Sequence, residues 1–342
     1  MLYYKGLEDI IFSKHELIEE PDELIIISGY LGPSPIERLK ELPMSVTIIG
    51  GMYTQGIDAR LHHSLEEIKT KNSNLTMKYS TEEIHSKIYI WKQKGKTLSA
   101  LIGSANFSSN GLRTDYRESL AEATRDTFSP LDDYLKFILN NSTDKPVINK
   151  KKTEIVLSPT TTELPSNTKS IEYKIDIPLY SVSNGTSVVM SKSGLNWGLS
   201  GAHVAEGDGY IHIPKYIYQE QKNIIKPFDK DFKSPTGTKK RNSEPIELVW
   251  DDGVIMEASF EGIQIVNGQK CPKQLASYSS KQLYLQGKRI SKKSILGRYM
   301  RNRLGVEVNE KITFEHLEKY GRTTITLSLI EDGVYYADFS VK

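Results

Sequence analysis

One short stretch of the chain holds residue types that together suit chemistry on a phosphodiester. It runs from His85 to Glu118 and contains an imidazole, an ammonium group, a Ser/Asn pair beside a glycine, and a carboxylate. His85 and Lys87 are two positions apart, so in an extended strand both side chains point to the same face. A neutral imidazole is a nucleophile, and an ammonium group with neutral hydrogen-bond donors can hold an anion. The stretch therefore predicts a site for attack on phosphorus.

The segments around these residues predict how they are brought together. A strand begins near Ile88, and the aliphatic run 98–102 marks a second strand that ends at Gly103. Ser104 and Asn106 follow this glycine directly. We therefore expect a hairpin whose ends carry the polar groups. The alternative is that these groups only decorate a solvated strand face and an ordinary turn.

The two motifs resemble the signature of the phospholipase D superfamily, which is His-x-Lys followed, across a short hairpin, by Gly-Ser-x-Asn. The matching residues are His85-Ser86-Lys87 and Gly103-Ser104-Ala105-Asn106. In that superfamily a carboxylate on the following strand fixes the tautomer of the catalytic imidazole. Glu118 lies in about that place, and Glu122 is the second choice. The resemblance covers roughly residues 1–140, and it implies these catalytic residues: His85, Lys87, Ser104, Asn106 and Glu118.

The signature occurs only once, because none of the other six histidines has a lysine two positions later. The superfamily mechanism uses two imidazoles, one that attacks phosphorus to give a phosphohistidine and one that protonates the leaving oxygen. The resemblance therefore implies a homodimer with its two-fold axis near His85 and a single site shared by two subunits. We expect no metal and no other cofactor, since no carboxylate cluster accompanies the motif. His62 and His63 are expected on a solvated helix face.

Strands and helices alternate through the first 140 residues. Strands are predicted at 24–28, 46–49, 75–79 and 119–123, and helices at 34–42, 59–71 and 130–139. Several of these strands are apolar on both faces, which favours an α/β phospholipase D-like domain with a central mixed sheet. A segment rich in Asn, Ser, Thr, Lys and Pro follows. We therefore predict a nuclease domain at 1–142, a linker at 143–170 and a second domain at 171–342.

The second domain has a different pattern and an uneven charge. Short alternating strands separated by Gly, Asn and Asp predict a mostly β sandwich or barrel, with one helix at 294–304. The net charge of the chain is only +2, yet residues 270–303 hold ten Lys or Arg and no Asp or Glu. Arg298 and Arg301 are predicted to share one helix face. Such a segment indicates a polyanion partner, although a solubilising surface loop is the alternative.

Three segments of this domain resemble the C-terminal part of the NgoFVII type of restriction endonuclease. They are Gly-Leu-Asn-Trp-Gly at 194–198, Tyr-Ile-His-Ile-Pro at 210–214, and Leu-Gly-Arg-Tyr-Met-Arg-Asn-Arg-Leu-Gly at 296–305. That family joins a phospholipase D-like nuclease to a β pseudobarrel related to the B-three DNA-binding domain of plants. The resemblance implies double-stranded DNA as partner, with arms near 192–199 and 267–277 in the major groove and phosphate contacts along 288–293. The candidate DNA contacts are Lys192, Asn196, Trp197, Lys270, Lys273, Gln274, Lys288, Arg289, Lys292 and Lys293.

These features together predict a metal-independent type II restriction endonuclease of the cytoplasm. Cys271 is the only cysteine, and the sequence has neither a signal-peptide core nor a run of 18 apolar residues. Two alternatives are a phospholipase D-like phosphatidyl hydrolase or transferase, and a non-catalytic DNA-binding protein. The sequence leaves open whether a separate ATP-driven translocase subunit or a companion methyltransferase works with the enzyme.

Overall fold

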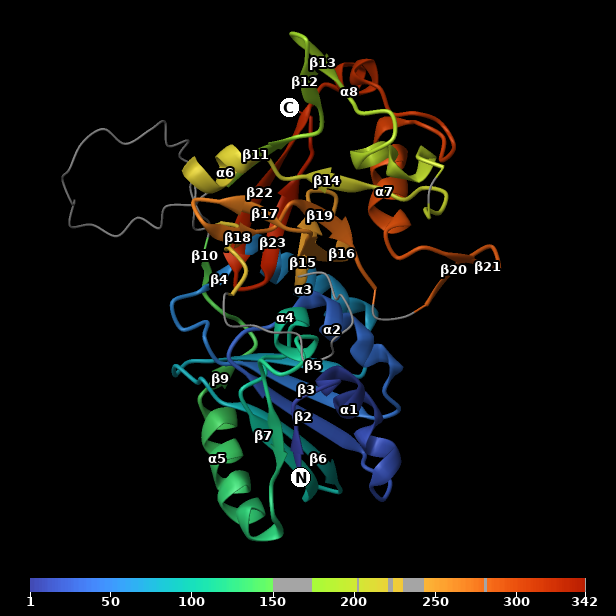
Figure 1. Ribbon diagram of the computed structural model, residues 1–342. Coiled ribbons are helices and arrows are strands. Elements are labelled where there is room, and N and C mark those ends of the chain that lie inside the picture. The colour runs from blue at the N-terminus through green and yellow to red at the C-terminus, as the bar shows by residue number, and fades with distance from the viewer. Residues whose placement is uncertain (150–173, 202, 221–223, 230–242, 280–281, 342) are drawn as a thin grey trace, which may run out of the picture. The chain divides into compact units, whose positions relative to one another are not determined.

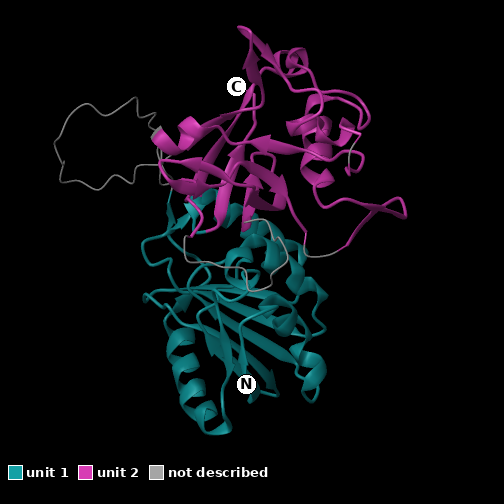
Figure 2. Cartoon of the chain, in the orientation of Figure 1, with its two compact units in different colours: residues 1–172, 330–332 teal, residues 173–329, 333–342 magenta. Residues whose placement is uncertain are grey.

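A computed structural model of the protein describes residues 1–149, 174–201, 203–220, 224–229, 243–279 and 282–341. The chain divides into two units (Figure 2). Unit 1 comprises residues 1–172 with 330–332, and unit 2 comprises residues 173–329 with 333–342.

Unit 1 is built on an eight-stranded mixed sheet in the order β1-β8-β7-β6-β2-β3-β5-β9 (Figure 1). The pairs β2–β3 and β3–β5 are parallel, and the remaining neighbours are antiparallel. This confirms the predicted α/β class. The strands are β1 (Leu2–Tyr3), β2 (Glu23–Ser28), β3 (Ser45–Gly50), β5 (Leu75–Ser80), β6 (Lys87–Gln93), β7 (Lys96–Gly103), β8 (Leu120–Glu122) and β9 (Ser142–Thr143). A separate parallel pair joins β4 (Ile57–Asp58) to β10 (Ile148–Asn149).

Helices cover both faces of this sheet, which explains why its central strand reads as one apolar run. Ile25 and Ile27 of β2 pack in one core cluster with Leu131 and Leu135 of α5. Ile26 points to the opposite face and is also fully buried. The helices are α1 (Leu7–Ser13), η1 (Lys14–Leu17), α2 (Pro33–Arg38), η2 (Leu39–Glu41), α3 (Ala59–Lys71), α4 (Ser109–Leu112), η3 (Arg125–Thr127) and α5 (Phe128–Asn140).

A buried carboxylate ties three parts of unit 1 together. Glu8 of α1 accepts hydrogen bonds from Nε and Nη2 of Arg113, which follows α4, at 2.5 and 2.8 Å. Arg38 of α2 forms an ion pair with the same carboxylate. Burial alone would raise the pKa of Glu8, but the two guanidinium groups outweigh burial and lower this pKa below its usual value. The ion pair thus links α1, α2 and the segment that follows α4.

Unit 2 is built on a seven-stranded sheet in the order β11-β22-β23-β15-β16-β19-β14. Strands β15 and β23 are parallel, and the other neighbouring pairs are antiparallel. The edge strands β11 and β14 approach each other, so the sheet is nearly closed into a barrel. The strands are β11 (Lys174–Pro178), β14 (Tyr210–His212), β15 (Ser243–Trp250), β16 (Ile255–Glu261), β19 (Gln274–Ser277), β22 (Thr324–Glu331) and β23 (Val334–Asp338).

Within the described stretches of unit 2, three small hairpins and four helices surround the sheet. The hairpins pair β12 (Ser181–Ser183) with β13 (Thr186–Val188), β17 (Gln264–Val266) with β18 (Gln269–Cys271), and β20 (Leu283–Leu285) with β21 (Lys288–Ile290). The helices are η4 (Gly194–Leu199), α6 (Lys215–Glu220), α7 (Ser294–Leu304) and α8 (Phe314–Tyr320). In the described ranges of the whole chain, no helix is long and apolar enough to cross a membrane.

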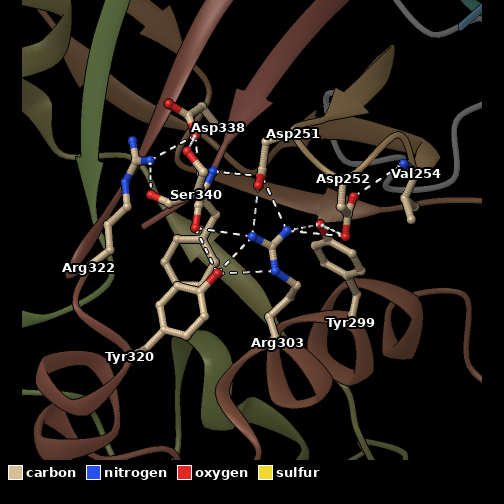
Figure 3. Close-up of polar contacts among 10 residues, drawn as sticks. Asp251, Asp252, Val254, Tyr299, Arg303, Tyr320, Arg322, Asp338 and Ser340 are labelled. Carbon is tan, nitrogen blue, oxygen red and sulfur yellow. Dashed lines mark hydrogen bonds and ion pairs between the residues drawn. The ribbon is translucent and has the colours of Figure 1, made fainter. Parts of the chain in front are cut away.

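A network around Arg303 fixes the C-terminal end of α7 (Figure 3). The guanidinium group donates to both carboxylate oxygens of Asp251, at 3.2 and 2.8 Å. It also donates to the hydroxyl of Tyr320 at 2.7 Å and to the backbone carbonyl of Phe339 at 3.2 Å. Asp251 follows β15, so this one side chain joins α7 to the sheet, to α8 and to the last strand. Such fully paired charges hold elements together rather than presenting charge to a ligand.

The predicted elements correspond closely to the observed ones. Helices α3 and α7 have the predicted bounds, and the helix predicted at 34–42 is α2 followed by η2. At the predicted start of the linker, residues 142–149 still contribute β9 and β10, which pair with strands of unit 1. The rest of the predicted linker, 150–170, lies outside the described residues.

The Glu8 network predicts a pH-dependent contribution to stability. Glu8→Gln keeps the shape of the side chain but leaves two buried guanidinium groups without their counter-charge, so we expect it to lower the free energy of unfolding by about 3–5 kcal/mol at neutral pH. The pKa of Glu8 in the folded state lies below its ordinary value of 4.5. The stabilisation is therefore complete above pH 4.5 and is lost as the pH falls through the folded-state pKa. Urea unfolding of variant and wild type between pH 7 and pH 3 measures this difference.

The matched control is Glu37→Gln on α2. Glu37 forms an exposed ion pair with Lys40 at 3.5 Å. Such pairs contribute about 1 kcal/mol or less. Equal losses from the two substitutions would contradict the role assigned to Glu8.

Candidate functional site

The predicted site residues of unit 1 lie at one end of its sheet, because the strand ends there form one row. The register pairs Ser28 with Gly50, Ile27 with Ile88, Lys87 with Gly103, and Gly103 with Leu120. His85 stands two residues before Lys87, and the Ser104–Asn106 segment begins just beyond Gly103. Glu118 stands two residues before Leu120. Segments at the ends of three strands, β6, β7 and β8, therefore bring the five predicted residues to a common edge.

His85 projects from a backbone that is held on both sides. The N–H of Ile84, a buried residue, donates to the carbonyl of Gly51 at 2.9 Å. The hydroxyl of Ser86 forms a 2.7 Å hydrogen bond with the hydroxyl of Tyr134 on α5. The His85 side chain itself is 68% exposed, and its Nε2 lies 3.4 Å from Oε1 of Glu83. The imidazole is therefore accessible to a large substrate while its position along the sheet edge is fixed.

The loop after β7 is tied to the core by its alternate residues. Ala105 and Phe107 are fully buried. The carbonyl of Ala105 accepts a hydrogen bond from the hydroxyl of Tyr89 at 2.8 Å, and the N–H of Phe107 donates to the hydroxyl of Ser28 at 2.9 Å. A Cβ on Gly103 would lie 2.0 Å from the carbonyl oxygen of Ser119, so only glycine fits where the two strands approach. These constraints leave the Ser/Asn pair outside the core.

Lys87 and Asn106 converge above the backbone of Gly29. A Cβ built on this glycine would lie 3.1 Å from Oδ1 of Asn106 and 3.5 Å from Nζ of Lys87. Oδ1 of Asn106 already accepts the N–H of Tyr30 at 3.2 Å, which leaves its NH₂ group to donate elsewhere. The same point is closely packed, since Cγ of Met52 lies 3.2 Å from it, so an anion held by the ammonium group of Lys87 and the NH₂ group of Asn106 would bind beside this point. Sequence reasoning missed Gly29, although its position directly after the apolar strand 24–28 could have indicated it.

Glu118 and Glu122, the two candidate carboxylates for the partner of the imidazole, make different contacts. Burial and the charge of Glu118 together raise the pKa of the Tyr89 hydroxyl. Glu118 precedes Ser119, whose N–H donates to the hydroxyl of Ser104 at 3.2 Å, so along the chain Glu118 is next to a residue that contacts the loop after β7. Among the described residues, Glu118 and His85 share no hydrogen bond in the single chain. Glu122 accepts hydrogen bonds from Lys14 at 2.6 Å and from the Tyr3 hydroxyl at 2.7 Å. Glu122 therefore joins β8 to the N-terminal segment.

His62 and His63 lie on α3 as expected. His63 is exposed and contacts Glu67 at 3.4 Å, and the ring of His62 packs 6.1 Å from that of Tyr79. Within the described ranges, no group of three His, Cys, Asp or Glu side chains is placed to hold a metal ion.

Unit 2 has a polar face across three neighbouring strands. His212 of β14 pairs with Gln274 of β19, which pairs with Glu261 of β16. Glu261 forms an ion pair with Lys293, and Nζ of Lys293 lies 5.6 Å from the ring centre of Trp197. Three predicted DNA contacts from distant parts of the sequence, Trp197, Gln274 and Lys293, therefore meet on one face.

Two further residues of this face were not predicted. Tyr210 packs its ring 5.9 Å from that of Trp197, and His212 is two residues further along the same strand. Burial and the nearby charge of Lys273 lower the pKa of His212. The alternation of the segment 210–214 was the available signal, because it places Tyr210 and His212 on the face opposite the buried Ile211.

Asn196 has a different place from the one predicted. Its side chain is 0% exposed. Nδ2 donates to the carbonyls of Met190 and Ile312, at 3.1 and 2.8 Å, and Oδ1 accepts from the N–H of Ile312 and from Arg301. All its polar atoms are thus occupied inside unit 2. Flanking glycines such as Gly194 and Gly198 are typical of an open loop. Here the segment forms η4 instead, and the Asn196 side chain is buried beneath it.

The basic segment 270–303 is also less exposed than its composition indicates. Arg301, predicted on a surface face with Arg298, is buried and donates to backbone carbonyls of Leu195 and Gly297. Arg303 belongs to the internal network of Figure 3. The exposed cations of the segment lie at Lys270, Lys273, Lys288 and Arg289, and Lys192 is exposed just before η4. Lys292 lies 5.2 Å from the ring centre of Tyr278, and Lys281 lies outside the described residues.

The hairpin β20–β21 extends away from the rest of unit 2 in Figure 1. Exposed Tyr284 stands opposite Arg289, and exposed Leu285 stands opposite Lys288. A two-stranded ribbon of this kind fits the major groove of DNA. The second arm was predicted at 267–277. This range includes β19, whose Leu275 and Ala276 are buried in the sheet.

The comparisons with known proteins agree with this geometry. Residues 5–157 match the family model of the NgoFVII restriction endonuclease N-terminal PLD domain, and residues 167–331 match that of the NgoFVII C-terminal B3-like DNA-binding domain. Fold and matches thus define a phospholipase D-type DNA nuclease joined to a DNA-binding domain. The chain belongs to the NgoFVII restriction endonuclease family.

Two solved structures are similar to parts of the chain. NucT from Helicobacter pylori is 17% identical over 42% of this chain and 96% of its own, with a TM-score of 0.29. Polyphosphate kinase from Porphyromonas gingivalis is 13% identical over 44% of this chain and 24% of its own, also with a TM-score of 0.29. No curated protein matches the chain.

The space above Gly29 gives a prediction about the unit 1 site. Gly29→Ala would place a methyl group against Asn106 and Lys87, so we expect kcat/KM for DNA cleavage to fall about 10- to 100-fold while the fold is retained. Steady-state cleavage of a defined duplex and thermal unfolding measure the two effects.

Gly95→Ala is the complementary control. Gly95 has φ +78° with no atom within 4 Å of a new Cβ, so this substitution strains the β6–β7 turn and leaves the site untouched. We expect a lower Tm with unchanged cleavage. An active Gly29→Ala enzyme would show that cleavage does not depend on how closely Asn106 and Lys87 approach Gly29.

The exposed lysines of unit 2 give a second prediction. Removing Lys270 and Lys273 together should weaken DNA binding and reduce the slope of log affinity against log salt by about 2, because each phosphate contact contributes about 0.9. Lys311→Ala with Lys319→Ala is the control of equal charge change in the same unit, with both lysines exposed. Titrations at several salt concentrations measure the slope. Equal effects of the two pairs would indicate only a general charge effect.

Proposed function

We propose that the protein is a metal-independent type II restriction endonuclease. Two copies of the chain share one active site, and the reaction passes through a phosphohistidine. The observation that carries this proposal is the exposed His85 beside the Lys87–Asn106 pair at one sheet edge. A nucleophile next to an anion clamp is sufficient for attack on a phosphodiester.

In the first step a neutral ring nitrogen of His85 attacks phosphorus in line with the leaving oxygen. The N–P bond forms as the P–O ester bond breaks, and the departing oxygen takes a proton. Lys87 with Ser104 and the free NH₂ of Asn106 holds the non-bridging oxygens and stabilises the charge of the transition state. Glu118, beside the same loop, orients the imidazole when substrate and partner are in place.

The leaving oxygen needs a second group, which donates a proton to it. The described part of one chain brings a single imidazole to this edge, and the two-fold symmetry of a homodimer would supply the other. The partner's His85 donates the proton, then accepts one from the water that hydrolyses the phosphohistidine. His85 is mostly exposed in the single chain, which leaves room for a second subunit and a duplex at the same edge.

Unit 2 would choose the place of cutting. Trp197, Gln274 and Lys293 with Tyr210 form its polar face, and the hairpin β20–β21 adds Lys288 and Arg289. The proposed division is a nuclease domain at 1–142, a linker at 143–170 and a DNA-binding domain at 171–342, with β9 and β10 carrying the nuclease domain into the start of this linker, as far as Asn149. A restriction enzyme acts on DNA in the cytoplasm, and a companion methyltransferase would protect the host sites there.

His85→Ala provides the direct test. Without the nucleophile, cleavage should fall by at least about 10⁴-fold while specific DNA binding persists. Wild-type cleavage should continue in EDTA, because the proposed reaction uses no metal ion. Plasmid cleavage and gel-shift assays measure these effects, with His63→Ala as the control. Cleavage that requires magnesium, or a His85→Ala protein that still cuts, would refute the mechanism.

The same variant tests the shared site. When wild-type and His85→Ala chains are refolded together, mixed dimers contain only one imidazole. Activity should then fall as the square of the wild-type fraction, because only wild-type dimers have both groups. Independent sites in each chain would give a linear decline instead.

A further inference from the structure

Unit 1 carries an exposed aromatic pair that its core does not need. Tyr4 and Tyr116 are 46% and 41% exposed, and their ring centres lie 5.3 Å apart at an angle of 43°. Nζ of the exposed Lys5 lies 4.5 Å from the ring centre of Tyr116. Two open rings beside an ammonium group have the composition of a surface that binds single-stranded nucleic acid.

The pair is held in an unusual backbone conformation. Tyr116 has φ +68°, a left-handed conformation that side chains other than glycine rarely adopt. Its N–H donates to the carbonyl of Tyr4 at 2.7 Å, and the N–H of Gly6 donates to Asp115 at 3.1 Å. The N-terminal segment therefore locks the loop in this form. Strain kept in place by surrounding contacts is common at functional sites.

The surface formed by Tyr4, Lys5 and Tyr116, here called the platform, also adjoins the proposed active site. Tyr116 is two residues before Glu118 and three before Ser119, whose N–H donates to the hydroxyl of Ser104 at 3.2 Å. Since a chain extends by at most about 3.6 Å per residue, the Cα of Tyr116 lies within about 11 Å of that of Ser119. A nucleotide spans a comparable distance, so a base next to a phosphate held at Ser104 can reach the rings.

We propose that Tyr4 and Tyr116 stack on a base adjoining the scissile phosphate, while Lys5 contacts a neighbouring phosphate of the same strand. This inference rests on the proposed function. A DNA strand suits the surface better than a second copy of the chain, because Lys5 keeps its ammonium group in solvent beside the rings, where an apolar subunit contact would have to bury it. The platform would hold an unstacked base and thereby turn its phosphate toward the imidazole.

The test is a double-mutant cycle between protein and substrate in the full chain. The cut position is mapped first, and an abasic nucleotide is then placed on either side of the scissile phosphate in turn. Tyr116→Ala alone and the effective abasic change alone should each lower kcat/KM about tenfold, and together they should cost no more than either one. Tyr116→Phe keeps the ring and should retain activity. Phe137→Ala, at an equally exposed aromatic on α5, is the matched control.

Three outcomes would overturn the platform. Multiplicative losses would show that Tyr116 and the base do not interact. Loss of the dimer in sedimentation of Tyr116→Ala would identify the rings as a subunit contact. A drop in Tm that accounts for the lost activity, without rescue by Tyr116→Phe, would make the pair structural only. Failure of the proposed function is separate, because it appears as cleavage by His85→Ala whatever the cycle shows.

Discussion

The hydroxyl group of Ser28 is the contact on which the nuclease site depends. It is fully buried at the end of β2, donates to the carbonyl of Tyr30 at 2.6 Å and accepts the N–H of Phe107 at 2.9 Å. One hydroxyl group thus forms hydrogen bonds with backbone groups of two segments, the one after β2 and the one after β7. Because it ties β2 to the loop after β7, the amide of Asn106 meets the ammonium of Lys87 above Gly29. Buried hydroxyl groups of this kind fix geometry because leaving them unpaired is costly.

The two units use charge in opposite ways. In unit 1 the buried Glu8 and its two arginines hold the helices, while the ammonium group of Lys87 at the sheet edge donates only to the backbone carbonyl of His85 among the described contacts. In unit 2 part of an acid-free segment turns inward, where Arg301 binds backbone carbonyls and Arg303 binds Asp251. The cations that remain on hairpins and on the polar face are fewer than the composition indicates.

The candidate site in one chain is incomplete in a specific sense. It has an exposed imidazole, a nearby ammonium group and amide, and a carboxylate on the next strand, but one imidazole cannot be both the proposed nucleophile and the leaving-group acid in the same step. The proposed homodimer would supply the missing group, since a two-fold axis duplicates each side chain. The exposed rings of Tyr4 and Tyr116 add a contact for the substrate itself. The physical role of the DNA-binding unit would then be to raise the local concentration of one phosphate at this edge.

The sequence by itself determined the fold class of each domain and the family, because these depend on local periodicity and on motifs of residues close together in the chain. It also located α3 and α7 correctly. Only the tertiary structure decided that Asn196 and Arg301 are internal, that Gly29 lies beneath the anion clamp, and that Trp197 meets Lys293. Burial and long-range contact depend on which elements pack together, and a basic or glycine-flanked residue has the same local sequence whether it faces water or the core.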